Sequence, residues 1–289
     1  MTPLSPASAA LEGFRVIRRE PQAVLVWILL WLVALSLTAM VLAAGHRVVI
    51  SDSGSYRSLN AVAERFGSFA VVFISLFLLV WTTTTVAAYR AVLFPYDRRA
   101  FFLRLGADEL RLAIMTISAS ALIVVLGGVP AFLLYVLASP FMAAVPMFAR
   151  YIATAGVFAT VALDIWMGVR LSLIAVETFA ERRFHLTAYW PMTQGRFWYL
   201  LASYAGCFVL FFVVVLIFGL VGLALPLVQS MVGVPSGVDP LRRGAYLVLA
   251  GVLAILTSGF FVVSTTLFCA CQAYAFRAIV GEGKAGVAL

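Results

Sequence analysis

The sequence predicts an all-α polytopic membrane protein, a single membrane domain over residues 1–289 with about six transmembrane helices. Hydrophobic residues make up 64% of the chain and charged residues only 11%, against about 25% charged in an ordinary soluble domain. The apolar residues fall in long uncharged runs, and a helix needs about 20 such residues to cross the bilayer. Six spans with their connections use most of the chain, which leaves no room for a soluble domain of normal size.

The six predicted spans cover about 23–44, 66–90, 112–138, 145–176, 197–226 and 245–276. The first contains 22 uncharged residues from Ala23 to Ala44, which exceeds the 7–15-residue core of a signal peptide, so we expect a retained helix. The uncharged stretch Leu112–Ala149 is too long for one helix. Pro140 favours a turn there, and we therefore divide it into the third and fourth spans.

The positive residues predict the orientation of the spans. The two termini and the segments after the second and fourth spans hold 14 of the 20 lysines and arginines. Positive residues are retained on the cytoplasmic side, so we expect both termini there. The net charge of +8 then implies anionic lipid headgroups as partners rather than nucleic acid. Four tryptophans near span ends fit an aromatic belt: Trp27, Trp31, Trp190 and Trp198.

Three segments on the predicted cytoplasmic side have the composition of elbows that lie along the membrane interface: Leu11–Arg19, Phe101–Arg111 and Arg182–Gly195. In the first two, Phe and Leu separate from charged residues at helical spacing, as in interfacial helices. The last two share a construction, an Arg-Arg cluster with a following phenylalanine and a glycine before the next span, which suggests a duplicated hairpin. The basic residues in and beside these elbows are Arg15, Arg18, Arg19, Arg98, Arg99, Arg104, Arg182, Arg183 and Arg196.

Asp164 is the acidic residue that the pattern places inside a span. An ionised carboxylate there costs about 2.5–3.5 kcal/mol unless it is paired. We expect a buried pair that fixes helix packing, with a proton or substrate site as the alternative. Arg170 is six residues away, which turns its side chain about 120° out of line, so Arg90 at the end of the second span is the first candidate partner and Arg170 the second.

The remaining polar groups inside spans carry no recognisable chemistry. The hydroxyls of Thr82–Thr85 and Ser264–Thr266 can bond to their own helix or line a small polar cavity. His46 and His185 fall on opposite sides of the membrane, and the three cysteines form no CxxC pair. The chain has no HExxH, Walker or GxSxG motif. We expect no catalytic residue, no metal site and no cofactor.

Three blocks carry a resemblance to known proteins: GFRVIRREPQAVLVW at 13–27, YRAVL at 89–93 with FLRLGADELRL at 102–112, and residues 170–201. In these blocks the chain resembles bacterial, chiefly alphaproteobacterial, six-helix membrane proteins of uncharacterised role. It is also similar to the membrane domain attached to some glycerophosphoryl diester phosphodiesterases. The resemblance implies a bacterial inner (cytoplasmic) membrane location. Phosphodiesterase activity in that group belongs to a separate soluble barrel that this sequence lacks, so the resemblance implies no enzyme.

Three classes of function remain open. The first is a non-enzymatic scaffold, chaperone or regulator that acts through the basic cytoplasmic face, with a membrane-protein partner or a second copy of the chain. The second is a carrier or permeability factor for a lipid or small solute with a mid-membrane polar site around Asp164, which the Gly- and Pro-interrupted helices favour. The third, a membrane-embedded enzyme, is disfavoured by the missing catalytic set.

Overall fold

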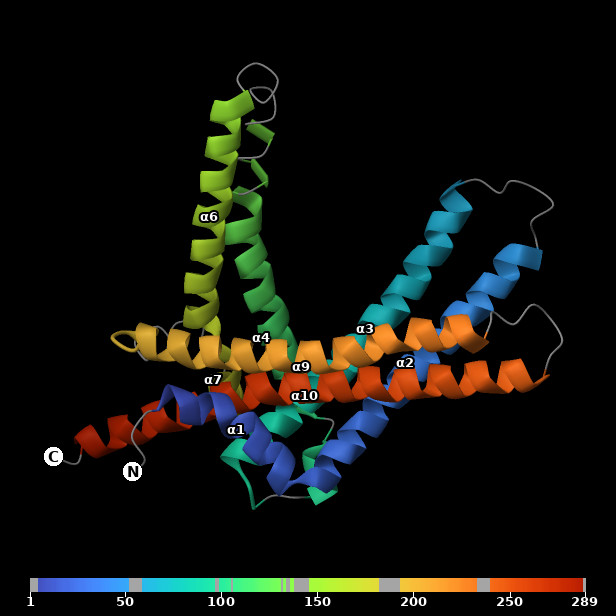
Figure 1. Ribbon diagram of the computed structural model, residues 1–289. Coiled ribbons are helices and arrows are strands. Elements are labelled where there is room, and N and C mark those ends of the chain that lie inside the picture. The colour runs from blue at the N-terminus through green and yellow to red at the C-terminus, as the bar shows by residue number, and fades with distance from the viewer. Residues whose placement is uncertain are drawn as a thin grey trace. The chain divides into compact units, whose positions relative to one another are not determined.

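The structure is a computed structural model that describes residues 5–51, 59–96, 99–104, 106–130, 132–133, 136–137, 146–181, 193–232 and 240–287. The described residues contain no strand, which confirms the all-α prediction (Figure 1). The elements are α1 (Pro6–Arg19), α2 (Pro21–Ser51), α3 (Leu59–Leu93), η1 (Arg99–Phe102), α4 (Ala107–Ile123), η2 (Val124–Gly128), α6 (Pro146–Leu171), α7 (Ile174–Glu181), α9 (Phe197–Val232) and α10 (Pro240–Val287).

Six helical segments are long and apolar enough to cross a membrane, which confirms the predicted number of spans. Each overlaps one predicted span. The segments are Pro21–Met40, Phe73–Leu93, Glu109–Leu126, Thr154–Glu181, Phe197–Leu220 and Val248–Gly281.

Two of the spans are interrupted. The third ends its α-helix at Ile123 and continues as a π-helical turn over Val124–Gly128. Pro130 follows this turn, and because proline lacks the amide hydrogen of a regular helix, a local widening accommodates it. In the fourth span, helix α6 ends at Leu171, the chain turns at Ser172 and Leu173, and α7 continues the apolar segment from Ile174 to Glu181.

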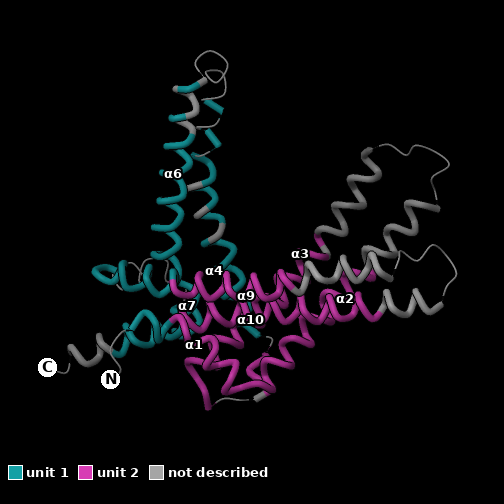
Figure 2. The backbone as a smooth tube through the Cα atoms, viewed as in Figure 1, with its two compact units in different colours: residues 1–9, 105–205, 272–289 teal, residues 10–104, 206–271 magenta. Residues whose placement is uncertain are grey.

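The chain divides into two compact units, each assembled from segments that are distant in sequence (Figure 2). Unit 1 contains residues 1–9, 105–205 and 272–289, and unit 2 contains residues 10–104 and 206–271. The single membrane domain over residues 1–289 stays a prediction.

The interior of unit 2 is built on aromatic packing between α2, α3 and α10. Trp31 of α2 stacks on Phe261 of α10, with ring centroids 4.7 Å apart, and meets Phe77 of α3 edge-on at 5.2 Å. Trp27 lies one turn before Trp31, and both indoles are buried. These contacts fix the mutual positions of three spans, since aromatic pairs of this geometry contribute beyond their buried area.

The burial of Trp27 and Trp31 contradicts the predicted aromatic belt at these two positions. Their rings fill the interior of unit 2 instead of facing the membrane interface. Trp198, by contrast, is 77% exposed at the start of α9, as a belt residue would be. Trp190 lies outside the described residues.

Three of the four hydroxyls of the Thr82–Thr85 run in α3 are used within their own helix. Thr82, Thr83 and Thr84 each donate to the carbonyl four residues earlier, at 2.7, 2.7 and 2.8 Å. All three side chains are buried. The packing interpretation of this run therefore fits the structure, because back-bonding satisfies a hydroxyl without a polar cavity.

Helix α1 packs closely on α9 and α10 through small residues. A Cβ built on Gly13 would lie 2.6 Å from the Cα atom of Leu267, and one built on Gly206 would lie 3.1 Å from the Cβ atom of Ala10. The Cys207 thiol sits at the same crossing and donates to the Leu267 carbonyl at 3.4 Å. Glycine at position 13 is therefore required for this contact, because any side chain would meet the backbone of α10.

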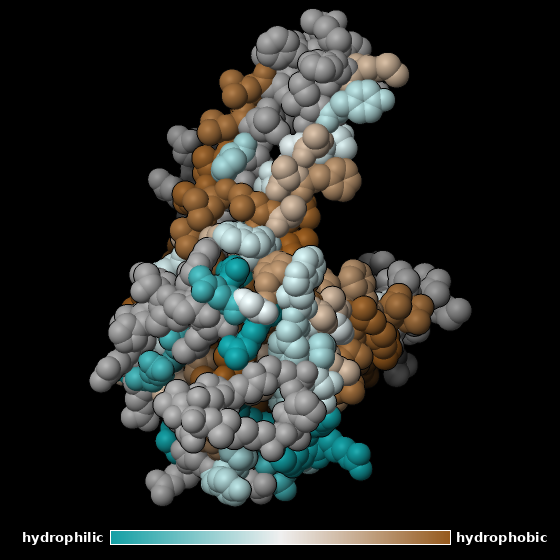
Figure 3. Space-filling model, turned by 90° about the vertical axis from the view of Figure 1, so that its left-hand side faces the viewer, coloured by the Kyte–Doolittle hydropathy of each residue, from teal (hydrophilic) through white to brown (hydrophobic). Residues whose placement is uncertain are grey.

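Unit 1 contains a smaller apolar cluster, formed by Met115 of α4, Met167 and Leu171 of α6, and Ile174 of α7. Away from these contacts, many large apolar side chains of the spans face outward, and hydrophobic residues are visible on the surface (Figure 3). Such a surface is expected where lipid rather than water surrounds the helices.

Candidate functional site

The connection between α3 and α4, residues 94–106 and hereafter the α3–α4 connection, is held by side chains from two helices. The indole Nε1 of Trp27 donates to the Phe101 carbonyl at 3.1 Å. The guanidinium of Arg90, in the last turn of α3, donates to the Phe102 carbonyl at 3.0 Å. Both donors are buried. A charged donor to a backbone carbonyl contributes about 1.5–3 kcal/mol, so these two bonds define the path of the connection.

The backbone that these bonds hold is strained. Ala100, Phe101 and Phe102 have φ values of 50°, 55° and 66°, a left-handed conformation that costs a non-glycine residue about 1–2 kcal/mol. Three such residues in succession persist only where surrounding contacts hold them. The interfacial helix predicted over Phe101–Arg111 is therefore not continuous, because the left-handed turn ends before α4 begins at Ala107.

The same connection exposes aromatic and basic side chains. Tyr96 is 99% exposed, Phe94 and Phe101 are about half exposed, and Arg104 is exposed. We call these four residues the exposed edge of the α3–α4 connection. Arg98 lies outside the described residues, as does the side chain of Arg99. The arrangement, a fixed backbone with outward aromatic and cationic groups, suits contact with a partner or with lipid headgroups.

Helix α1 carries three more arginines in unit 2, and one of them contacts the end of α3 just before this connection. Arg19 donates to the Ala91 carbonyl at the end of α3. Arg15, whose side chain is exposed, pairs at 3.1 Å with the buried Glu12, and Arg18 is exposed. The inner face of α1 packs on α9 and α10, so these arginines belong to a helix that is held in place.

The connection before α9, in unit 1, repeats one element of this design. Arg170, in the last turn of α6, donates from its guanidinium to Thr193 Oγ1 at 2.8 Å. Its guanidinium carbon also lies 5.8 Å from the Trp166 ring centroid and 6.0 Å from that of Phe197, within the range of cation–π attraction. Arg90 and Arg170 therefore both bind the segment that leads into the next span, which accords with the duplication suggested by the sequence.

The other predicted residues of this region are only partly described. Arg196 is half-buried just before α9, and its amide donates to the Thr193 carbonyl at 3.3 Å. Gly195 has a φ of 73°, which glycine adopts without strain. Arg182 and Arg183 lie outside the described residues.

The predicted partners of Asp164 have other bonds in the structure. Asp164 is half-buried on α6. Arg170 lies in the same unit and bonds to Thr193 as described above. Asp164 and Arg90 belong to different units, so their pairing stays a prediction.

Four glutamates are buried among the described residues, Glu12, Glu20, Glu109 and Glu177, and the sequence predicts none of them as buried. Glu177 of α7 is 2% exposed and Glu109 of α4 is 6% exposed. Among the described residues, neither oxygen of Glu177 has a hydrogen-bond partner. A signal for Glu177 was present, because Leu173 and Ile174 precede it by four and three residues and so share its helical face.

The described residues contain no group of three or more His, Cys, Asp or Glu side chains arranged to hold a metal ion. A pocket of about 280 Å³ lies between α9 and α10, and its lining does not include Asp164. No family model, no curated protein and no solved structure matches the chain.

Proposed function

We propose that this chain is a non-enzymatic integral membrane protein that acts as a scaffold, chaperone or regulator through its basic cytoplasmic face. The observation that carries the proposal is the α3–α4 connection, where Trp27 and Arg90 fix the backbone and the exposed edge projects outward. The protein belongs, in this proposal, to a bacterial inner membrane, with both termini in the cytoplasm.

The chemistry of the exposed edge favours a protein partner. Tyrosine and arginine are enriched among residues that dominate binding energies at interfaces. A backbone that is already held in place loses little conformational entropy on binding. The strain at Ala100–Phe102 points in the same direction, because left-handed non-glycine residues cluster where a precise backbone path serves a function.

A photo-cross-linking residue in place of Tyr96 tests this proposal in intact membranes. The matched control carries the same residue in place of Leu29, which is 58% exposed on α2 and is surrounded by lipid if α2 spans the membrane. We expect a discrete protein adduct at position 96, absent at position 29 and lost when Arg104→Glu is added. Adducts only with lipid at position 96, or the same adducts at both positions, would contradict a partner-binding role.

A further inference from the structure

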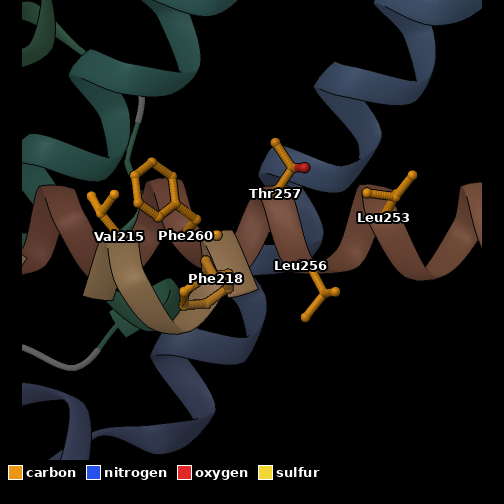
Figure 4. A pocket seen from close by; sticks show the side chains of 7 residues that line it. Val215, Phe218, Leu253, Leu256, Thr257 and Phe260 are labelled. Atoms are coloured by element: carbon orange, nitrogen blue, oxygen red, sulfur yellow. The ribbon is translucent and has the colours of Figure 1, made fainter. Parts of the chain in front are cut away.

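A groove lies between α9 and α10 on the surface of unit 2, with a volume of about 280 Å³ (Figure 4). Its walls come from one face of each helix, since the lining positions are spaced by three and four residues. Val215, Phe218 and Gly219 line it from α9, and Leu253, Leu256 and Phe260 from α10. Thr257 contributes the one hydroxyl of the lining.

The shape of the groove is fixed by aromatic contacts and by a missing side chain. The rings of Phe218 and Phe260 meet edge-on, with centroids 5.7 Å apart. A Cβ built on Gly259 would lie 3.7 Å from the Phe218 ring, so this ring rests directly on the backbone of α10. A Cβ built on Gly219 would find no atom within 4 Å, so the groove is open at this position.

The surroundings of the groove identify the medium that meets it. Both of its helices are among those long and apolar enough to cross a membrane. Leu216 and Ile255, on the same helices, are 62% and 52% exposed. In a bilayer these faces meet hydrocarbon, and an apolar depression left empty there would forfeit dispersion contacts along its walls.

We propose that this groove binds one acyl chain of a membrane lipid. Six of its seven lining residues offer no hydrogen-bonding side chain, so they suit an aliphatic occupant. Its volume is near the lower end of the range for ligand pockets, about 300–1,000 Å³, and suits a single flexible chain. A helix from a second copy, about 10–12 Å across with its side chains, could enter it only with individual side chains, and the test below separates this occupant from an acyl chain. This inference does not rest on the function proposed for the α3–α4 connection.

The test uses the full chain in vesicles of phosphatidylcholine that carries a diazirine in one acyl chain. Photolysis followed by mass spectrometry maps the labelled residues. We expect labelling at Val215 and Leu253 to exceed labelling at Leu216, which meets only the general bilayer. This comparison needs no substitution, and equal labelling at all three positions would overturn the proposal.

A pair of glycine variants supplies the second arm. Gly219→Leu places a side chain in the groove, whereas Gly251→Leu places one on the opposite face of α10, where a Cβ also finds no atom within 4 Å. Both replace a helical glycine by a better helix former, so neither should impair folding. We expect the excess labelling to be lost in Gly219→Leu and kept in Gly251→Leu. Retention of the excess lipid labelling in Gly219→Leu would overturn the proposal. If the parent chain instead shows no excess lipid labelling but forms a cross-linked dimer, and Gly219→Leu loses that dimer, the proposal would be overturned in favour of a second copy.

Discussion

Substitution of Gly13 by valine tests the packing of α1. The new Cβ would lie 2.6 Å from the Cα atom and 2.9 Å from the Cδ2 atom of Leu267. Carbon atoms prefer a separation of about 3.5–4.0 Å, so α1 must withdraw by about 1 Å. Overpacking of this kind costs about 1–3 kcal/mol, and replacing a helical glycine by valine returns about 0.5 kcal/mol. We expect the variant to lose about 0.5–2.5 kcal/mol of stability.

The loss can be measured by reversible unfolding in mixed micelles, followed by tryptophan fluorescence. Gly251→Val is the matched control, because position 251 has no neighbouring atom within 4 Å; this variant should be as stable as the parent or slightly more so. If Gly13→Val unfolds at the same denaturant concentration as Gly251→Val, the close packing of α1 on α10 is wrong.

A cross-link reports the position of α1 independently of stability. A Cβ on Gly206 would lie 3.1 Å from the Cβ atom of Ala10, close to the separation of about 3.5–4.5 Å in a disulfide. The pair Ala10→Cys and Gly206→Cys should therefore cross-link readily under mild oxidation. Adding Gly13→Val should lower the yield, and an unchanged yield would show that α1 accommodates the side chain without moving.

Three further predictions concern the connection, the buried charges and the topology. Trp27→Phe keeps the ring but removes the indole N–H, so it should cost about 1–3 kcal/mol through an unpaired carbonyl; an unchanged unfolding midpoint would contradict the bond. Asp164→Asn and Arg90→Leu should each destabilise the protein, and the double variant should lose less than their sum, since removing one partner leaves the other charge buried; strict additivity would reject the pair. Reporter fusions after Asp52 and Arg98 should report outside and inside respectively, and an outside signal at Arg98 would end the six-span orientation.

The spans could be predicted because their length and apolar composition are local properties of the chain. The bonding partners of individual side chains are harder to predict, because they depend on how distant segments fold together. The depth of Arg90 in the membrane predicts a pair with Asp164, which stays a prediction, but it does not predict the bond from Arg90 to the Phe102 carbonyl, which forms because the connection after α3 folds back over Arg90. The path of the connection cannot be predicted from the pattern of charges, because it depends on three residues in the left-handed conformation, none of which is a glycine.

Tryptophan and glycine show the same limit. Trp27 and Trp31 occupy the ends of a run where belt residues are common, and only the packing of α2 on α3 and α10 shows that they face inward. The need for Gly13 arises from a helix more than 250 residues later. The sequence near Gly13 predicted a helix at this position, which the structure has, but it contained nothing about the surface on which the helix docks, and the charged Glu12 is buried there.

The contact between Gly13 and Leu267 also sets an order of events during synthesis. The two residues are 254 positions apart, and at roughly 5–20 residues per second the ribosome needs about 10–50 s to cover that distance. Throughout that interval the small-residue face of α1 has no α10 to pack against. The first helix of the chain to be made thus reaches its final place only after the last one has been made. A truncation before α10 should leave α1 accessible to protease even though every earlier span is present.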